Sequence, residues 1–131
     1  MAIAFDAASS ATTTTATLEW THTVGAGGAD RFLFVGITWR ANDTPAAQTL
    51  NTVTYGGQSL TRIGAANRVI GTGNRVHEIW RLINPPTGAN TLTATFSAAV
   101  QAAGGATSWT GVDQTTPLGT EAQASGHTRL C

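Results

Sequence analysis

The chain has 131 residues, of which 41% are hydrophobic and only 11% charged, and its formal net charge is zero. This length suits one domain, residues 1–131, with a buried core. All seven basic residues are arginine, and the lack of a basic excess argues against nucleic acid as a partner. No apolar run reaches the roughly 18 residues of a membrane span, so we expect a soluble protein without one.

The cysteine and histidine content argues against a metal centre. Cys131 is the only cysteine and cannot form a disulfide within the chain. A zinc framework needs several Cys or His ligands at fixed spacing, and no such spacing occurs. We therefore expect neither a metal nor a cofactor.

Alternation of apolar and polar residues predicts strands from the start of the chain. Residues 2–6 form a short candidate. Residues 17–24, "TLEWTHTV", place His22 in the same register as the apolar residues, while threonines and a glutamate take the other face. Residues 31–39, "RFLFVGITW", are apolar almost throughout, which is typical of a central strand covered on both faces.

Two glycines separate the next two apolar runs, in "VTYGGQSLTRIG" at residues 53–64. A Gly-Gly connection suits a type I′ hairpin, because both of its central residues need positive φ. A phosphate-binding loop would require a following helix and a lysine. We therefore interpret Gly56 and Gly57 as a hairpin turn.

Further strands are expected at residues 75–83, 91–96 and 104–112, and the connections between them are rich in Gly, Pro, Asn and Asp. Only residues 45–48 and 98–103 have the composition of a helical turn. The regular spacing of turns, about ten residues, favours an all-β fold. We predict an antiparallel β-sandwich of jelly-roll or Ig-like topology, with about eight strands and almost no helix.

Glu78 lies in an apolar register with Val76 and Trp80, so its carboxylate needs a partner. Three arginines are candidates: Arg31, Arg62 and Arg68. In the opposite register, Ile79 and Ile83 face the core and Glu78 is exposed to solvent. Alternatively, if the strands that carry them are neighbours, His22 and Glu78 form a structural polar pair. A hydrolase that uses His22 or His77 with a carboxylate is one alternative function, but no catalytic residue is assigned.

Two aromatic residues stand beside predicted loops. Trp39 ends a strand and Tyr55 adjoins the hairpin. Either these rings pack in the core and at its rim, or they are partly exposed and available for stacking on a sugar. Together with Arg40 and Asp43, which follow Trp39, they are the candidate ligand-binding residues. A carbohydrate-binding module is therefore another alternative function.

Three segments carry a resemblance that covers roughly residues 2–120: "VTYGGQSLT", "EIWRL" followed by "PPTG", and "TGVDQTTPLG". The chain resembles β-sandwich modules of large secreted or surface bacterial proteins, also found in phage-linked and environmental sequences. The resemblance implies an extracellular or cell-surface, non-catalytic binding or assembly role, and no catalytic residues carry over. Such modules continue beyond "TPLGT" with further strands. We therefore expect an incomplete sandwich that forms a homo-oligomer or is completed by a partner protein, with a glycan as a further candidate partner.

Overall fold

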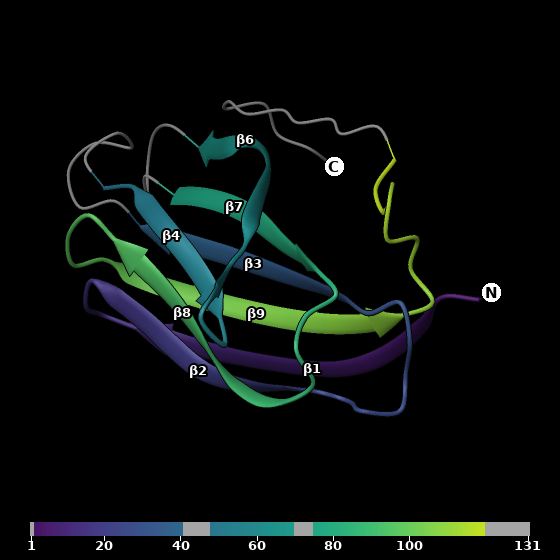
Figure 1. The fold of residues 1–131 in the computed structure, drawn as a ribbon. Coiled ribbons are helices and arrows are strands. Elements are labelled where there is room, and N and C mark those ends of the chain that lie inside the picture. Colours follow the sequence, from purple (N-terminus) through teal and green to yellow (C-terminus); the bar gives the residue numbers. More distant parts are fainter. Residues whose placement is uncertain (1, 41–47, 70–74, 120–131) are drawn as a thin grey trace.

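The computed structural model describes residues 2–40, 48–69 and 75–119, with the backbone alone described at 65–69. These residues form nine strands in two antiparallel sheets, which Figure 1 shows packed face to face. Within the same residues no helix is long and apolar enough to cross a membrane. The five-stranded sheet has the spatial order β1 (Ala4–Thr13), β9 (Gln101–Thr110), β3 (Phe32–Arg40), β7 (Arg75–Ile83) and β6 (Thr61–Val69). The four-stranded sheet has the order β2 (Thr17–Val24), β8 (Gly88–Phe96), β4 (Leu50–Tyr55) and β5 (Gln58–Ser59).

The strand pairing is that of one long hairpin rolled into two layers. β4 pairs with β5 at its tip, and β3 pairs with β7, β2 with β8 and β1 with β9 as the two arms return. Successive pairs alternate between the two sheets, which is the arrangement of a jelly roll. β6 is an additional edge strand inserted between β5 and β7. The predicted antiparallel sandwich is confirmed, with nine strands instead of about eight.

The tip of this rolled hairpin is the Gly56-Gly57 turn. Tyr55 pairs with Gln58 directly across it. The φ angles of Gly56 and Gly57 are 56° and 84°, so both central positions are in the left-handed region that glycine adopts without strain. The prediction of a two-residue hairpin is confirmed, and a strand follows the turn where a phosphate loop would need a helix.

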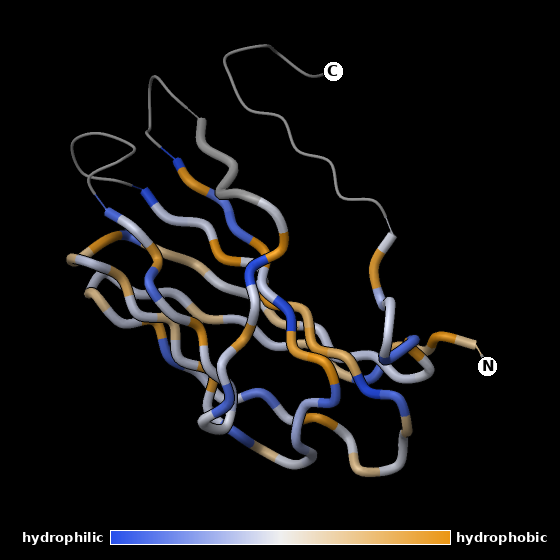
Figure 2. Tube along the Cα trace, turned by 45° about the horizontal axis from the view of Figure 1, so that its top comes forward, coloured by the Kyte–Doolittle hydropathy of each residue, from blue (hydrophilic) through white to orange (hydrophobic). Residues whose placement is uncertain are grey.

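The core lies between the sheets and is built from the alternate residues of each strand. Figure 2 shows the resulting mixture of hydrophobic and hydrophilic positions along single strands. The rings of Trp39 on β3 and Phe96 on β8 meet edge to face across the two layers, 5.2 Å apart. Gly104 on β9 lets β2 approach closely, because a Cβ there would lie 2.8 Å from the Trp20 ring and 2.9 Å from Leu18. Close packing between β2 and β9 therefore depends on this glycine.

Strand boundaries differ from the predicted ones where pairing, and not periodicity, determines them, as at the end of β1 and the start of β9. β1 runs to Thr13 although its sequence after Asp6 contains only Ala, Ser and Thr, since β9 pairs with it along its whole length. β9 begins at Gln101, so the proposed helical turn at residues 98–103 is wrong. These small residues fit a strand because the neighbouring β1 and β3 supply its hydrogen bonds.

Candidate functional site

Five polar side chains form a continuous chain inside the sandwich, between β1, β2 and β9. Trp20 Nε1 lies 2.8 Å from Ser9 Oγ, which lies 2.7 Å from Nδ1 of His22. On the other side of the imidazole, Nε2 lies 2.9 Å from Ser108 Oγ, and this hydroxyl lies 2.6 Å from Asp6 Oδ2. His22 and Ser108 are fully buried. We call these residues the hydroxyl relay.

The donor at one end of the relay, Trp20, and the acceptor at the other, Asp6, constrain the directions of its hydrogen bonds. An indole N–H only donates, so Ser9 Oγ accepts from Trp20 Nε1. A carboxylate only accepts, so Ser108 donates to Asp6 and receives the Nε2 proton of His22. When His22 is neutral with its proton on Nε2, Nδ1 has a lone pair and accepts the Ser9 hydroxyl proton.

Burial and hydrogen bonding shift the pKa values at both ionisable members of the relay. Burial lowers the pKa of His22 and outweighs the opposing attraction of the Asp6 carboxylate. Burial alone would raise the pKa of Asp6, but hydrogen bonds from the Ser108 hydroxyl and the Gly25 amide, with the field of His22, lower it instead. A neutral imidazole beside an ionised carboxylate is thus the stable state near pH 7.

The relay contains a serine directed at a histidine, which is the arrangement that activates a nucleophile. Two features oppose that use. The Trp20 N–H donates to Ser9 Oγ and draws electron density from the oxygen that would have to attack. In the described part of the chain, the outer face of the five-stranded sheet has two hollows, of about 670 and 320 Å³, and neither is lined by Ser9 or His22. The Ser108 hydroxyl links His22 to Asp6, so a histidine and a carboxylate do lie close together. The hydrolase hypothesis therefore stays a prediction.

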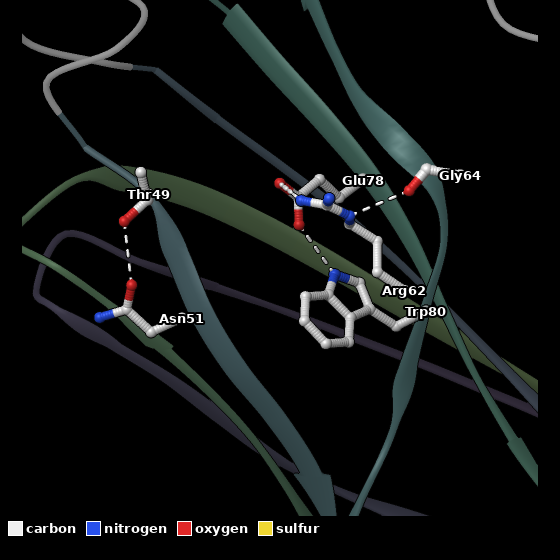
Figure 3. A network of polar contacts seen from close by, with 6 residues as sticks. All are labelled: Thr49, Asn51, Arg62, Gly64, Glu78 and Trp80. Carbon is white, nitrogen blue, oxygen red and sulfur yellow. Dashed lines mark hydrogen bonds and ion pairs between the residues drawn. The ribbon is translucent and has the colours of Figure 1, made fainter.

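Glu78 has its own partners on the inner side of the five-stranded sheet (Figure 3). Trp80 Nε1 donates to Glu78 Oε1 at 3.0 Å, and Arg62 Nη1 lies 3.5 Å from Glu78 Oε2. Arg62 also donates from Nε to the Gly64 carbonyl oxygen at 3.0 Å. The carboxylate is buried and the guanidinium is half-exposed, so the pair extends from the core to its rim. Of the three candidate arginines, Arg62 is a partner.

A polar pair between His22 and Glu78 does not form. β2 belongs to the four-stranded sheet, whereas β7 lies in the other sheet beyond β9 and β3. Each residue therefore finds partners of its own. Arg31, another candidate partner of Glu78, donates instead to the Pro85 carbonyl oxygen at 3.0 Å.

The aromatic stacking surface predicted at Trp39 and Tyr55 is wrong, because both rings face the core. Trp39 is 2% exposed, and its indole packs on Phe96. Tyr55 is fully buried, and its hydroxyl donates to the carbonyl oxygens of His22 and Gly88 at 2.8 and 3.1 Å. A residue at the end of a strand keeps the facing that its register assigns, whatever loop follows.

A hollow of about 670 Å³ lies at one end of the five-stranded sheet. Its lining comes from residues 12–14, 38–40, 75 and 101–103, on four strand ends that lie side by side. In β3 the exposed residues alternate with the buried ones that fill the core, so Thr38 and Arg40 point away from the other sheet. The hollow is therefore on the outer face of the sheet.

Two arginines stand next to each other in this hollow. Arg40 on β3 is paired across the sheet with Arg75 on β7 and, on its other side, with Gln101 on β9. Directly opposed residues have Cβ atoms about 5 Å apart, and like charges there repel. All three side chains are exposed. Neither arginine makes an ion pair or hydrogen bond with any described residue, and Thr12 and Thr38 add hydroxyl groups nearby.

Of the predicted ligand-binding residues, only Arg40 lies at a surface site with its side chain directed outward. Asp43 falls outside the described residues. Sequence reasoning missed Arg75 and Gln101, because each reads as an ordinary exposed strand residue until the pairing of β7, β3 and β9 brings them together. Among the described side chains, no three His, Cys, Asp or Glu residues gather closely enough to hold a metal ion.

Comparison with known proteins adds no assignment. No protein-family model matches the chain, and neither a curated protein nor a solved structure matches it.

Proposed function

We propose that the chain is a non-catalytic binding module, extracellular or displayed on a bacterial cell surface, that binds an anionic ligand in the outer hollow of the five-stranded sheet. The observation that carries this proposal is the opposed pair of Arg40 and Arg75, exposed in a hollow of about 670 Å³.

The pair is electrostatically unfavourable without a ligand. Like charges directly opposite each other destabilise a strand pair, and no described carboxylate neutralises Arg40 or Arg75. An oxyanion placed between the two guanidinium groups removes the repulsion and accepts charge-assisted hydrogen bonds from both. The amide of Gln101 and the hydroxyl of Thr38 provide further polar contacts to the same ligand.

The test is calorimetric titration of glucuronate and of sulfate into the protein and into Arg40→Gln, Arg75→Gln and Arg81→Gln variants. Arg81 is the matched control, because it lies on β7 in the same alternation as Arg75 but lines neither hollow. We expect binding that weakens as salt screens the charges. Arg40→Gln and Arg75→Gln should each weaken it strongly, and Arg81→Gln should leave it unchanged. Absence of binding to the unmodified protein, or equal loss in all three variants, would refute the proposal.

Assembly is a second candidate role, favoured by apolar side chains at the start of the chain. Ile3 and Phe5 are 63% and 57% exposed, and Phe5 packs edge to face on the half-buried Trp109, 5.4 Å away. Contact with a second copy or a partner protein would remove this surface from water. Sedimentation should show self-association that Phe5→Ser abolishes, and a monomer at every concentration would argue against a homo-oligomer.

A further inference from the structure

A second hollow, of about 320 Å³, lies on the same outer face of the five-stranded sheet. Both hollows are lined by Thr38 and Ala103, which are paired across β3 and β9, so the two hollows adjoin, and we call them together the groove. Gly36 lies four residues before Arg40 on β3, and at about 3.3 Å per residue the groove extends about 13 Å between them. The groove is therefore longer than a single small anion requires.

The far end of this groove differs chemically from the arginine end. Its floor is the backbone at Gly36 and its cross-strand partner Gly105, and a Cβ built at Gly36 would meet nothing within 4 Å. Ile79, paired with Gly36 on the other side, is 51% exposed and forms an apolar wall. The end thus has a flat, open floor with an apolar side. Between the two ends, Thr12 and Thr38 offer hydroxyl groups.

We propose that the groove binds an acidic glycan chain, with a uronate carboxylate on Arg40 and Arg75 and a neighbouring sugar ring on the Gly36 floor. This assignment rests on the proposed function. A uronic-acid chain has a chemical group for each part of the groove. Its carboxylates suit the arginine end, its hydroxyl groups, which both donate and accept, suit Thr12 and Thr38, and its flat ring faces with C–H surface suit the Gly36 floor.

The other extended polyanions fit the groove less well. A peptide gains its affinity by pairing with free backbone groups at a sheet edge, but β9, β3 and β7 are interior strands whose backbone groups already pair with neighbours. Single-stranded nucleic acid binds by stacking successive bases on several aromatic faces. Of the aromatic residues that line the groove, Trp39 is buried and the His77 imidazole is exposed, so the groove offers a single ring for stacking. The glycan is thus the occupant that the chemistry favours.

The experiment compares four probes by calorimetry: an oligogalacturonate, its carboxyl-reduced neutral form, monomeric galacturonate and an oligoglutamate of equal charge. The variants are Arg40→Gln, Gly36→Val, which places a side chain on the floor of the second hollow, and Thr21→Val, which places valine at an exposed position of β2. We expect the acidic oligomer to bind more tightly than the monomer. Gly36→Val should weaken only the oligomer, about tenfold, or about 1.4 kcal/mol. Arg40→Gln should weaken both, and Thr21→Val neither.

The outcomes separate the two proposals. If Arg40→Gln abolishes binding but Gly36→Val leaves the oligomer unaffected, the groove is an anion site and the glycan assignment is wrong. Equal binding of the neutral oligomer, or of oligoglutamate, also overturns the glycan assignment. If no acidic probe binds the unmodified protein, the proposed function fails with it.

Discussion

The hydroxyl relay and the arginine pair are both groups of polar side chains on neighbouring strands, but only the relay is closed. Between Trp20 and Asp6 every relay proton has an acceptor within the protein, and the two central members, His22 and Ser108, are buried. Arg40 and Arg75 face each other at the surface with no described acceptor. A closed network stabilises the fold because its groups have replaced water with partners, whereas an open one keeps its donors available for a ligand.

The largest expected effect comes from breaking the closed network. His22→Ala leaves the Ser9 and Ser108 hydroxyls without their shared partner and opens a cavity, so the free energy of unfolding should fall by about 3 kcal/mol. Urea unfolding measures the change. His77→Ala removes an exposed histidine from β7 and should stay within about 0.5 kcal/mol of the unmodified protein. Equal losses in the two variants would contradict the stabilising role of the relay.

The two faces of the five-stranded sheet should respond differently to an added valine. Gly104→Val places atoms against Trp20 and Leu18 and should destabilise the fold by about 2 kcal/mol through overpacking. Gly36→Val meets open space at the first added carbon and should leave stability unchanged or raise it slightly. Thermal unfolding of both variants tests this contrast. A larger loss of stability for Gly36→Val would show that the outer face at Gly36 is not open.

Stability should also depend on pH through the relay. The pKa of His22 is lowered in the folded protein, so protons bind the unfolded chain more readily. The contribution of His22 is complete above its unfolded pKa of about 6.5 and is lost as the pH falls below that value. The lowered pKa of Asp6 adds a loss in the same direction below about pH 4. Unfolding temperatures between pH 7.5 and 5 measure the effect.

A histidine control identifies the group that titrates. His77→Ala keeps the relay intact, so its unfolding temperature should follow the same pH curve as the unmodified protein. If removing His77 flattens the curve instead, the assignment of the pH dependence to His22 is wrong.

The smallest effect on stability is expected at the open pair. Arg40→Gln removes one of two opposed charges, so in the absence of ligand the free energy of unfolding should stay equal or rise by a few tenths of a kcal/mol. Added glucuronate should raise the unfolding temperature of the unmodified protein but not that of the variant. A marked destabilisation of the ligand-free variant would mean that Arg40 has a structural role.

The parts of the fold that depend on local pattern were predictable from the sequence. Period-two alternation predicted β2 with both of its ends, and the need for positive φ predicted the turn at Gly56 and Gly57. The same reasoning indicated that the buried Glu78 requires an arginine. In each case the constraint lies within one strand, one turn or one buried charge.

The site was harder to predict because it depends on which strands are neighbours. Arg40 and Arg75 each alternate onto an exposed face, but nothing in either strand indicates that β3 and β7 pair in the register that opposes them. Trp39 was predicted to be exposed because a loop follows it, although the alternation within its own strand already placed it among the buried residues. The relay was missed because Ser9 and Ser108 are separated by almost the whole chain.

The most direct test of the contrast between the open and closed networks is an NMR titration of the arginine Nε–H and histidine ring signals with glucuronate. The account predicts that the signals of Arg40 and Arg75 shift together and saturate. Those of His22, Arg62 and Arg81 should stay in place. Shifts spread evenly over all arginines, or a response at His22 without one at Arg40 and Arg75, would contradict it.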